Sequence, residues 1–212
     1  MKNKYRWLLL LFLSACNGFD SLVPFSEPQP AGKRAMDAIP RKLQGKYFSE
    51  RQQAFLWIGE HSAALVMDYD VVTTRKELDT AYRLSGDSLF NSLGEPPRKV
   101  AVQGDTIRWH EHETDSVFDI ARGDVLKKDK GYYFLNRRLA ANSWTVTRLS
   151  LSHGKLLVAN VDDPASLARL ETLAEKPTDT VHPVYTISRK QFRNLQQEGG
   201  FRTVDSFFKT KP

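Results

Sequence analysis

Two histidines lie close together in Arg108–Thr114, which reads RWHEHET. The residue types favour a β-strand, on which His110 and His112 point to the same face. Two imidazoles at this spacing can bind one metal ion, but zinc usually takes three or four protein ligands. Arg108 shares their face and Trp109 lies on the other, which is typical of a strand with one solvent-exposed face. We therefore expect no metal site, and His110 and His112 are the candidate ligands if there is one.

Asp68 and Asp70 also share one face of a predicted strand. Paired carboxylates can perform acid–base catalysis or bind calcium. A calcium loop supplies many oxygen ligands within about a dozen residues, whereas this stretch supplies two carboxylates. We expect both aspartates to lie on a solvated face.

Other short motifs are explained more simply as turns. Arg122-Gly123-Asp124 matches a cell-adhesion tripeptide, but it is the third of three Gly-Asp turns, and Ser152-His153-Gly154 lies at a further turn. The sequence has no Gly-x-Ser-x-Gly, no glycine-rich phosphate loop and no His-Glu-x-x-His. We therefore expect no catalytic residue and no cofactor. The alternative is an envelope hydrolase or a metal-dependent enzyme whose ligands converge from distant strands.

The single cysteine, Cys16, follows the features of an export signal. The first six residues carry three positive charges, and Trp7–Leu13 is apolar. A positive start, a short apolar core and small residues before a cleavage site describe a signal peptide. The apolar run is well short of the roughly 20 residues that a membrane-spanning helix needs. We therefore predict that residues 1–15 are a signal peptide that is removed.

Leu13-Ser14-Ala15-Cys16 resembles the lipobox of bacterial lipoproteins. The resemblance implies that the thiol of Cys16 receives a diacylglyceryl group, that cleavage follows Ala15, and that the new amine is acylated. Two or more acyl chains hold a protein firmly on a bilayer. The alternative is an ordinary secreted protein. Asn17 follows the cysteine, and the same family analogy favours the periplasmic face of the outer membrane.

The charge of the chain is mild once the signal is removed. The full chain carries a net charge of +6, and the three positive charges of residues 1–15 account for half of it. Such a charge does not indicate nucleic-acid binding. A lipidated Cys16 leaves no thiol for a disulfide or a metal, so the fold must rely on its core.

Residues 16–40 contain four prolines. Because proline-rich linkers are extended spacers, we predict that this lipidated segment lifts the folded part off the bilayer. Its apolar residues Phe25 and Ile39 are able to dock on the domain.

Residues 41–212 are predicted to form a β-rich globular domain with a helical C-terminal part. Runs rich in aromatic and β-branched residues alternate with glycine-containing turns, which is typical of an antiparallel meander. The clearest runs are 54–59, 63–72, 131–139, 143–152 and 155–161. In 143–152 the apolar residues change face, which predicts a bulge or bend near Arg148.

Two helices are predicted near the C-terminus, at 162–175 and 188–200. An aspartate and Pro164 begin the first, while Ser188 caps the second and two glycines end it. Phe192 and Leu195 have the spacing of a helix face that packs on a core. Phe207 and Phe208 are adjacent, so in a strand they face opposite ways.

The sequence thus predicts a mainly β or α+β fold, in which an antiparallel β-meander forms a barrel or half-barrel, with two C-terminal helices. Gly45-Lys46-Tyr47 loosely resembles the opening strand of lipocalin-like barrels. The layout also resembles uncharacterised lipoproteins of the Bacteroidota type, which implies no particular activity.

We therefore expect a non-catalytic binding or structural β-domain in the cell envelope, attached to the membrane through the lipid on Cys16. The expected partner is an envelope protein, a glycan or an apolar ligand, and not a nucleic acid. A barrel with an open apolar interior favours small-molecule or lipid binding, and a filled barrel favours surface contact or a structural role.

Overall fold

The computed structural model describes residues 19, 21, 23–175, 177, 179 and 183–210. The chain divides into two compact units: unit 1 combines residues up to Ala64 with those from Ser116 onward, and unit 2 is Leu65–Asp115. Within the described ranges no helix is long and apolar enough to cross a membrane. The predicted signal peptide and Cys16 lie outside the described residues, so both stay predictions.

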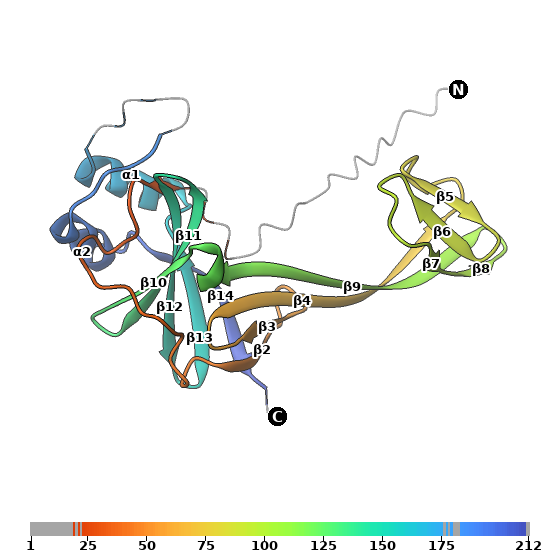
Figure 1. Cartoon of the computed structure of the whole chain (residues 1–212), viewed down its shortest axis with the longest axis horizontal. Helices are drawn as coiled ribbons and strands as arrows, with labels where there is room; N and C mark the ends of the chain where they lie inside the picture. The colour runs from red at the N-terminus through yellow and green to blue at the C-terminus, as the bar shows by residue number, and fades with distance from the viewer. Residues whose placement is uncertain are drawn as a thin grey trace, which may run out of the picture. The chain divides into compact units, whose positions relative to one another are not determined.

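Unit 1 is built on an open antiparallel sheet (Figure 1). Its strands pair in the order β10-β11-β12-β13-β14-β2-β3-β4, and β1 pairs with β12. The predicted mainly β fold with a large antiparallel sheet and two helices is confirmed, and of the two predicted forms the sheet is not the closed barrel. The strands are β1 (Pro24–Phe25), β2 (Gly45–Ser49), β3 (Ala54–Ile58), β4 (Ser62–Thr74), β10 (Val125–Asp129), β11 (Tyr132–Ala140), β12 (Ser143–Ser152), β13 (Lys155–Asn160) and β14 (Arg202–Lys209).

Two helices lie between β13 and β14 in the chain and pack at the same end of this sheet (Figure 1). Helix α1 (Pro164–Leu173) begins at Asp163, whose carboxylate accepts hydrogen bonds from two backbone N–H groups. Helix α2 (Arg189–Gln197) begins with the capping box of Ser188 and Gln191. Both helices start where the capping residues predict.

One face of the sheet is apolar where these helices cover it. Phe192 of α2 makes edge-to-face contacts with Phe25 and Phe134 at centroid distances of 6.3 and 5.3 Å. The buried members of this cluster are Val23, Phe25, Phe134, Val146, Ala159, Val161, Leu170, Tyr185, Ile187, Phe192, Leu195 and Phe201. The core positions predicted for Phe192 and Leu195 are therefore confirmed.

Strand β12 has no bulge near Arg148, because its register with β11 and β13 is continuous there. Its apolar residues change face because the sheet is covered differently along its length. Val146 packs under the helices, whereas Leu149 is buried on the opposite face. The register shifts of neighbouring strands instead lie between Arg138 and Ala140 and between Val158 and Ala159.

Among the described residues, the proline-rich segment is packed against the sheet from Phe19 onward and is not a free spacer. Phe25 is fully buried and Ile39 nearly so, and Phe25 lies opposite Trp144 of β12. The segment docks because its apolar residues remove from water surface that an extended linker would leave exposed. The spacer predicted over 16–40 is in this respect corrected.

Buried polar side chains of the sheet fix this segment in place. The side chain of Asn136 on β11 accepts a hydrogen bond from the backbone N–H of Gln29 at 2.5 Å. It also donates one to the backbone carbonyl of Gln29 at 2.9 Å. The ammonium of Lys127 on β10 donates to the carbonyls of Pro28 and Pro30 at 2.6 and 3.0 Å. These bonds satisfy backbone groups of an irregular segment that would otherwise be buried without partners.

Asp129, at the end of β10, joins three parts of unit 1. Its buried carboxylate lies 3.0 Å from Nζ of Lys33 in the N-terminal segment and 3.0 Å from Nε of Arg193 in α2. The hydrogen bond from Arg193, followed by that from Lys33, lowers the pKa of Asp129 to about 2. The carboxylate is therefore strongly stabilised in its charged form.

Unit 2 consists of parts of two long strands and of the short strands that lie between them in the chain. Strand β9 (Thr106–Asp119) lies next to β4 and also pairs with β8 (Ala101–Gln103). A separate three-stranded sheet is formed by β5 (Tyr82–Ser85), β6 (Ser88–Asn91) and β7 (Arg98–Lys99). The small buried core of unit 2 consists of Leu89, Val100 and Ile107. Residues 41–212, predicted as one domain, thus include all of unit 2 and most of unit 1.

We expect Phe25→Ala to lower the free energy of unfolding by about 3–5 kcal/mol, the usual cost of deleting a buried phenylalanine side chain. Chemical denaturation followed by tryptophan fluorescence measures this loss. Phe208→Ala is the matched control, because Phe208 is 38% exposed and its removal should cost well under half as much. Equal losses in the two variants would mean that the N-terminal segment is not part of the core.

Asp129 should make stability depend on acid pH. Its folded-state pKa is about 2, below the ordinary value of 3.8, so its stabilising contribution is present above pH 4 and is lost as the pH falls through 2. The difference corresponds to about 2 kcal/mol. Asp129→Asn should remove this part of the pH dependence in urea unfolding between pH 2 and 6. Glu60→Gln, a change at an exposed carboxylate of the same unit, should leave the profile unchanged.

Candidate functional site

Unit 2 brings the two candidate histidines next to the two predicted aspartates. Nδ1 of His110 on β9 lies 3.0 Å from Oδ1 of Asp70 on β4. Nδ1 of His112 lies 2.7 Å from Oδ1 of Asp68, and Nε2 of His110 is 3.6 Å from the same oxygen. All four side chains are exposed, as predicted for a solvated strand face.

The electrostatics of this cluster favour charged pairs. The hydrogen bond with Asp70 raises the pKa of His110, and the hydrogen bond with His112 lowers the pKa of Asp68. Both shifts stabilise imidazolium beside carboxylate. Protonation of His110 therefore strengthens the exposed contact between β4 and β9.

The arrangement pairs side chains across two neighbouring strands. In the part of the chain that the structure describes, no group of three or more His, Cys, Asp or Glu side chains could hold a metal ion. His110 and His112 each face a carboxylate across the strand pair. Sequence spacing predicted which residues share a face on each strand, but not the register that sets the two pairs opposite each other.

The Arg-Gly-Asp tripeptide lies at the end of a short 3-10 helix, Ile120–Arg122. The hairpin turn predicted at this position is therefore wrong. Gly123 has φ of 92°, a left-handed conformation that glycine adopts without strain. The carboxylate of Asp124 accepts hydrogen bonds from the backbone N–H groups of Asp119 and Arg138, both at 2.8 Å. Asp124 thus closes this loop, which accounts for the motif.

The turn between β12 and β13 places a hydroxyl beside an imidazole, at Ser152 and His153. Oγ of Ser152 lies 3.0 Å from Nδ1 of His153. A catalytic serine needs a base that a third group orients. Among the residues described, no carboxylate forms an ion pair with His153 within 4.0 Å. The pair is therefore better explained as a contact within the turn between β12 and β13.

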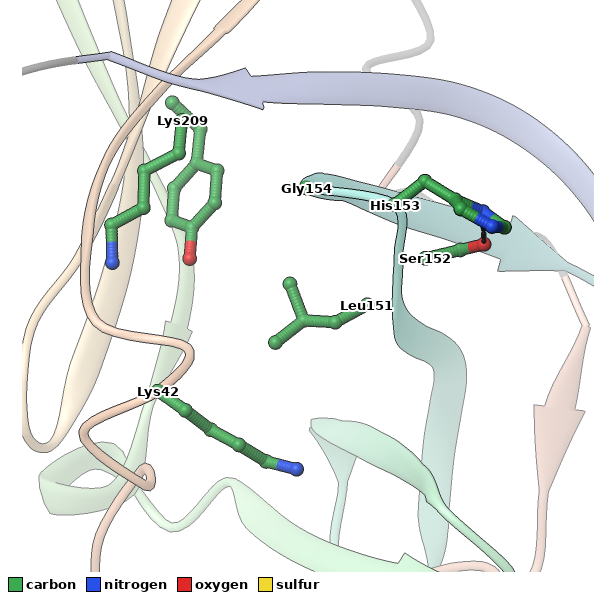
Figure 2. Close-up of a pocket in the computed structure, with 7 residues that line it drawn as sticks. Lys42, Leu151, Ser152, His153, Gly154 and Lys209 are labelled. Carbon is green, nitrogen blue, oxygen red and sulfur yellow. Dashed lines mark hydrogen bonds between the residues drawn. The ribbon is translucent and has the colours of Figure 1, made fainter.

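A pocket of about 310 Å³ lies beside this turn (Figure 2). Its Leu151 is on the face of β12 opposite that of Val146, which packs under the helices. Such a volume is at the lower end of the range for ligand pockets. Leu151, which is 40% exposed, lies between Lys42 and Lys209 in Figure 2. The lining residues are Lys42, Tyr47, Leu151, Ser152, His153, Gly154 and Lys209.

The ammonium groups of the two pocket lysines, Lys42 and Lys209, each lie above an aromatic ring. Nζ of Lys209 is 5.6 Å from the ring centroid of Tyr47 and donates a hydrogen bond to the carbonyl of Gln44 at 2.9 Å. Nζ of Lys42 is 5.4 Å from the ring centroid of Tyr133. Burial raises the pKa of Tyr47, so its hydroxyl stays neutral and donates to the carbonyl of Leu43.

The pocket therefore combines an apolar floor with a cationic rim. Its lining contains two lysines and one histidine but no carboxylate. Such a site can hold an anionic group at the rim and an apolar group against Leu151. The sequence did not indicate this pocket, because its residues come from three strands and two loops that are distant in the chain.

Comparisons with protein-family models, with curated proteins and with solved structures find no match.

Protonation of His110 should depend on Asp70. We expect its pKa to lie above 6.5, the ordinary value, in the native chain and to move toward that value in Asp70→Asn. Because the folded-state pKa is raised, the stabilisation from this pair is present at low pH and is lost as the pH rises through the folded pKa. Proton NMR of the imidazole C–H signals measures both titrations. Asp105→Asn, in a turn of the same unit, should leave the His110 titration unchanged.

Proposed function

We propose that this protein is a lipoprotein of the bacterial cell envelope, attached to the membrane by acyl chains on Cys16. The observation that carries the proposal is the order of features in residues 1–16: positive charges, a short apolar run, small residues and the single cysteine. Export and cleavage before Cys16 would place its thiol at the new N-terminus. Asn17 favours the periplasmic face of the outer membrane.

We further propose that the β-rich part acts by binding and not by catalysis. The support for this is the pocket around Leu151, whose apolar floor and cationic rim are features of a ligand site. Among the wider set of expected partners, an envelope protein, a glycan or an apolar ligand, this pocket favours a small ligand with an apolar part.

Intact mass spectrometry of the protein purified from membranes of a bacterial host tests the anchor. The expected mass is that of a chain beginning at Cys16 with added acyl groups, because a thiol at the mature N-terminus is the group that receives the lipid. Cys16→Ser should abolish the acylated species and release the protein from the membrane fraction. An unmodified, soluble native protein would contradict the proposal and make the chain a freely secreted one.

A further inference from the structure

Phe19, the first residue of the chain that the structure describes, is buried and lies three positions after Cys16 in the sequence. Phe19 is 2% exposed, and its ring centroid lies 6.0 Å from that of Phe207 on β14. Its carbonyl accepts a hydrogen bond from the hydroxyl of Thr147 on β12 at 3.2 Å. Three residues span at most about 11 Å even when fully extended. A lipid on Cys16 would therefore hold unit 1 directly at the bilayer surface.

The pocket around Leu151 lies close to this attachment point. Phe207 pairs with Leu156 of β13, and Leu156 pairs with Leu151 of β12. Residues directly opposite each other in adjacent strands share a sheet face, and adjacent strands are about 4.8 Å apart. Lys209 follows Phe207 by two positions and so lies on the same face. Leu151 of the pocket and Phe207, the residue that Phe19 contacts, thus lie on the same face of the sheet. Two strand spacings, about 10 Å, separate their backbones.

The chemistry of the pocket suits the headgroup layer of a membrane. Lys42 and Lys209 are exposed, and within the described residues neither forms an ion pair with a carboxylate. A third ammonium, that of Lys128, lies 5.5 Å from the ring of Tyr133, the same ring that Lys42 overlies. Lysine side chains lie along apolar surface while their ammonium groups bind lipid phosphates. The exposed side chain of Leu151 supplies such an apolar surface.

We propose that the pocket around Leu151 binds the headgroup of an anionic bilayer phospholipid, with the ammonium groups of Lys42 and Lys209 contacting its phosphate. The proposal rests on the proposed lipid anchor, because the short connection between Cys16 and Phe19 is what brings the pocket to the bilayer. Its occupant is a lipid of the membrane that holds the anchor. The pocket would orient unit 1 on that membrane.

Vesicle binding without the anchor tests the proposal. All contacts of the fold described above lie at Phe19 or beyond, so a chain beginning at residue 16 and carrying Cys16→Ser keeps them. This protein is floated with vesicles of phosphatidylcholine alone or mixed with phosphatidylglycerol. We expect binding to the mixed vesicles, and Lys42→Gln combined with Lys209→Gln should lower the partition coefficient about 30-fold. Lys76→Gln combined with Lys190→Gln removes the same charge at exposed positions outside the pocket and should change it less than about 2-fold.

Three outcomes would overturn the inference: no binding to the mixed vesicles, equal losses in the two double variants, or binding of free glycerol phosphate with no preference for vesicles. Equal losses would show a general effect of charge, and the third outcome would show a soluble ligand. The intact mass of the native protein reports on Cys16 alone. An acylated Cys16 with no pocket-dependent vesicle binding would therefore refute this inference and leave the anchor standing.

Discussion

Hydrogen bonds from buried side chains of β10 and β11 to the backbone of residues 28–30 are the interactions on which the rest of unit 1 depends. Asn136 pairs with both backbone groups of Gln29, and Lys127 donates to the prolines on either side. Each of these groups would be costly to bury without a partner. With the segment fixed at this point, Phe25 enters the helix-covered cluster, and the chain before it reaches Phe207 through Phe19. The attachment thus determines where the chain leaves the fold toward Cys16.

The sheet of unit 1 is covered differently along its length, and this explains both its core and its pocket. Helices α1 and α2 cover one face at one end, where Phe134 and Val146 are buried. On the opposite face the apolar side chains include Leu149 and Leu156, which are also buried. Leu151 lies at the edge of this second buried region, one residue before the end of β12. Leu151 is therefore partly exposed, and Lys42 and Lys209 beside it give this edge of the buried region a positive charge.

Pairs of charged side chains join the two long strands of unit 2, whereas a large apolar cluster holds the sheet and helices of unit 1 together. A pair of strands has little core of its own, and its exposed face carries the aspartates of β4 opposite the histidines of β9. Exposed ion pairs contribute little each, so this contribution is small and depends on protonation. The small apolar cluster of Leu89, Val100 and Ile107 provides the remaining packing. The histidines are thereby accounted for as partners of carboxylates on the neighbouring strand.

Local patterns in the sequence were sufficient for the fold class, most of the strands of unit 1, the two helices and their caps, because these depend on alternation, on capping residues and on turns. Phe192 and Leu195 were recognised as core for the same reason. The spacing could not reveal that the proline-rich segment is buried, since its docking depends on Asn136 and Lys127, about a hundred residues away. Nor could it reveal the pairing of His112 with Asp68 or the pocket of Lys42, Leu151 and Lys209, because strand register and the order of strands bring these residues together. The signal pattern that ends at Cys16 is local and is read from the sequence alone, whereas the proximity of Phe19 to the pocket is decided by the tertiary structure, through the packing of Phe19 on Phe207.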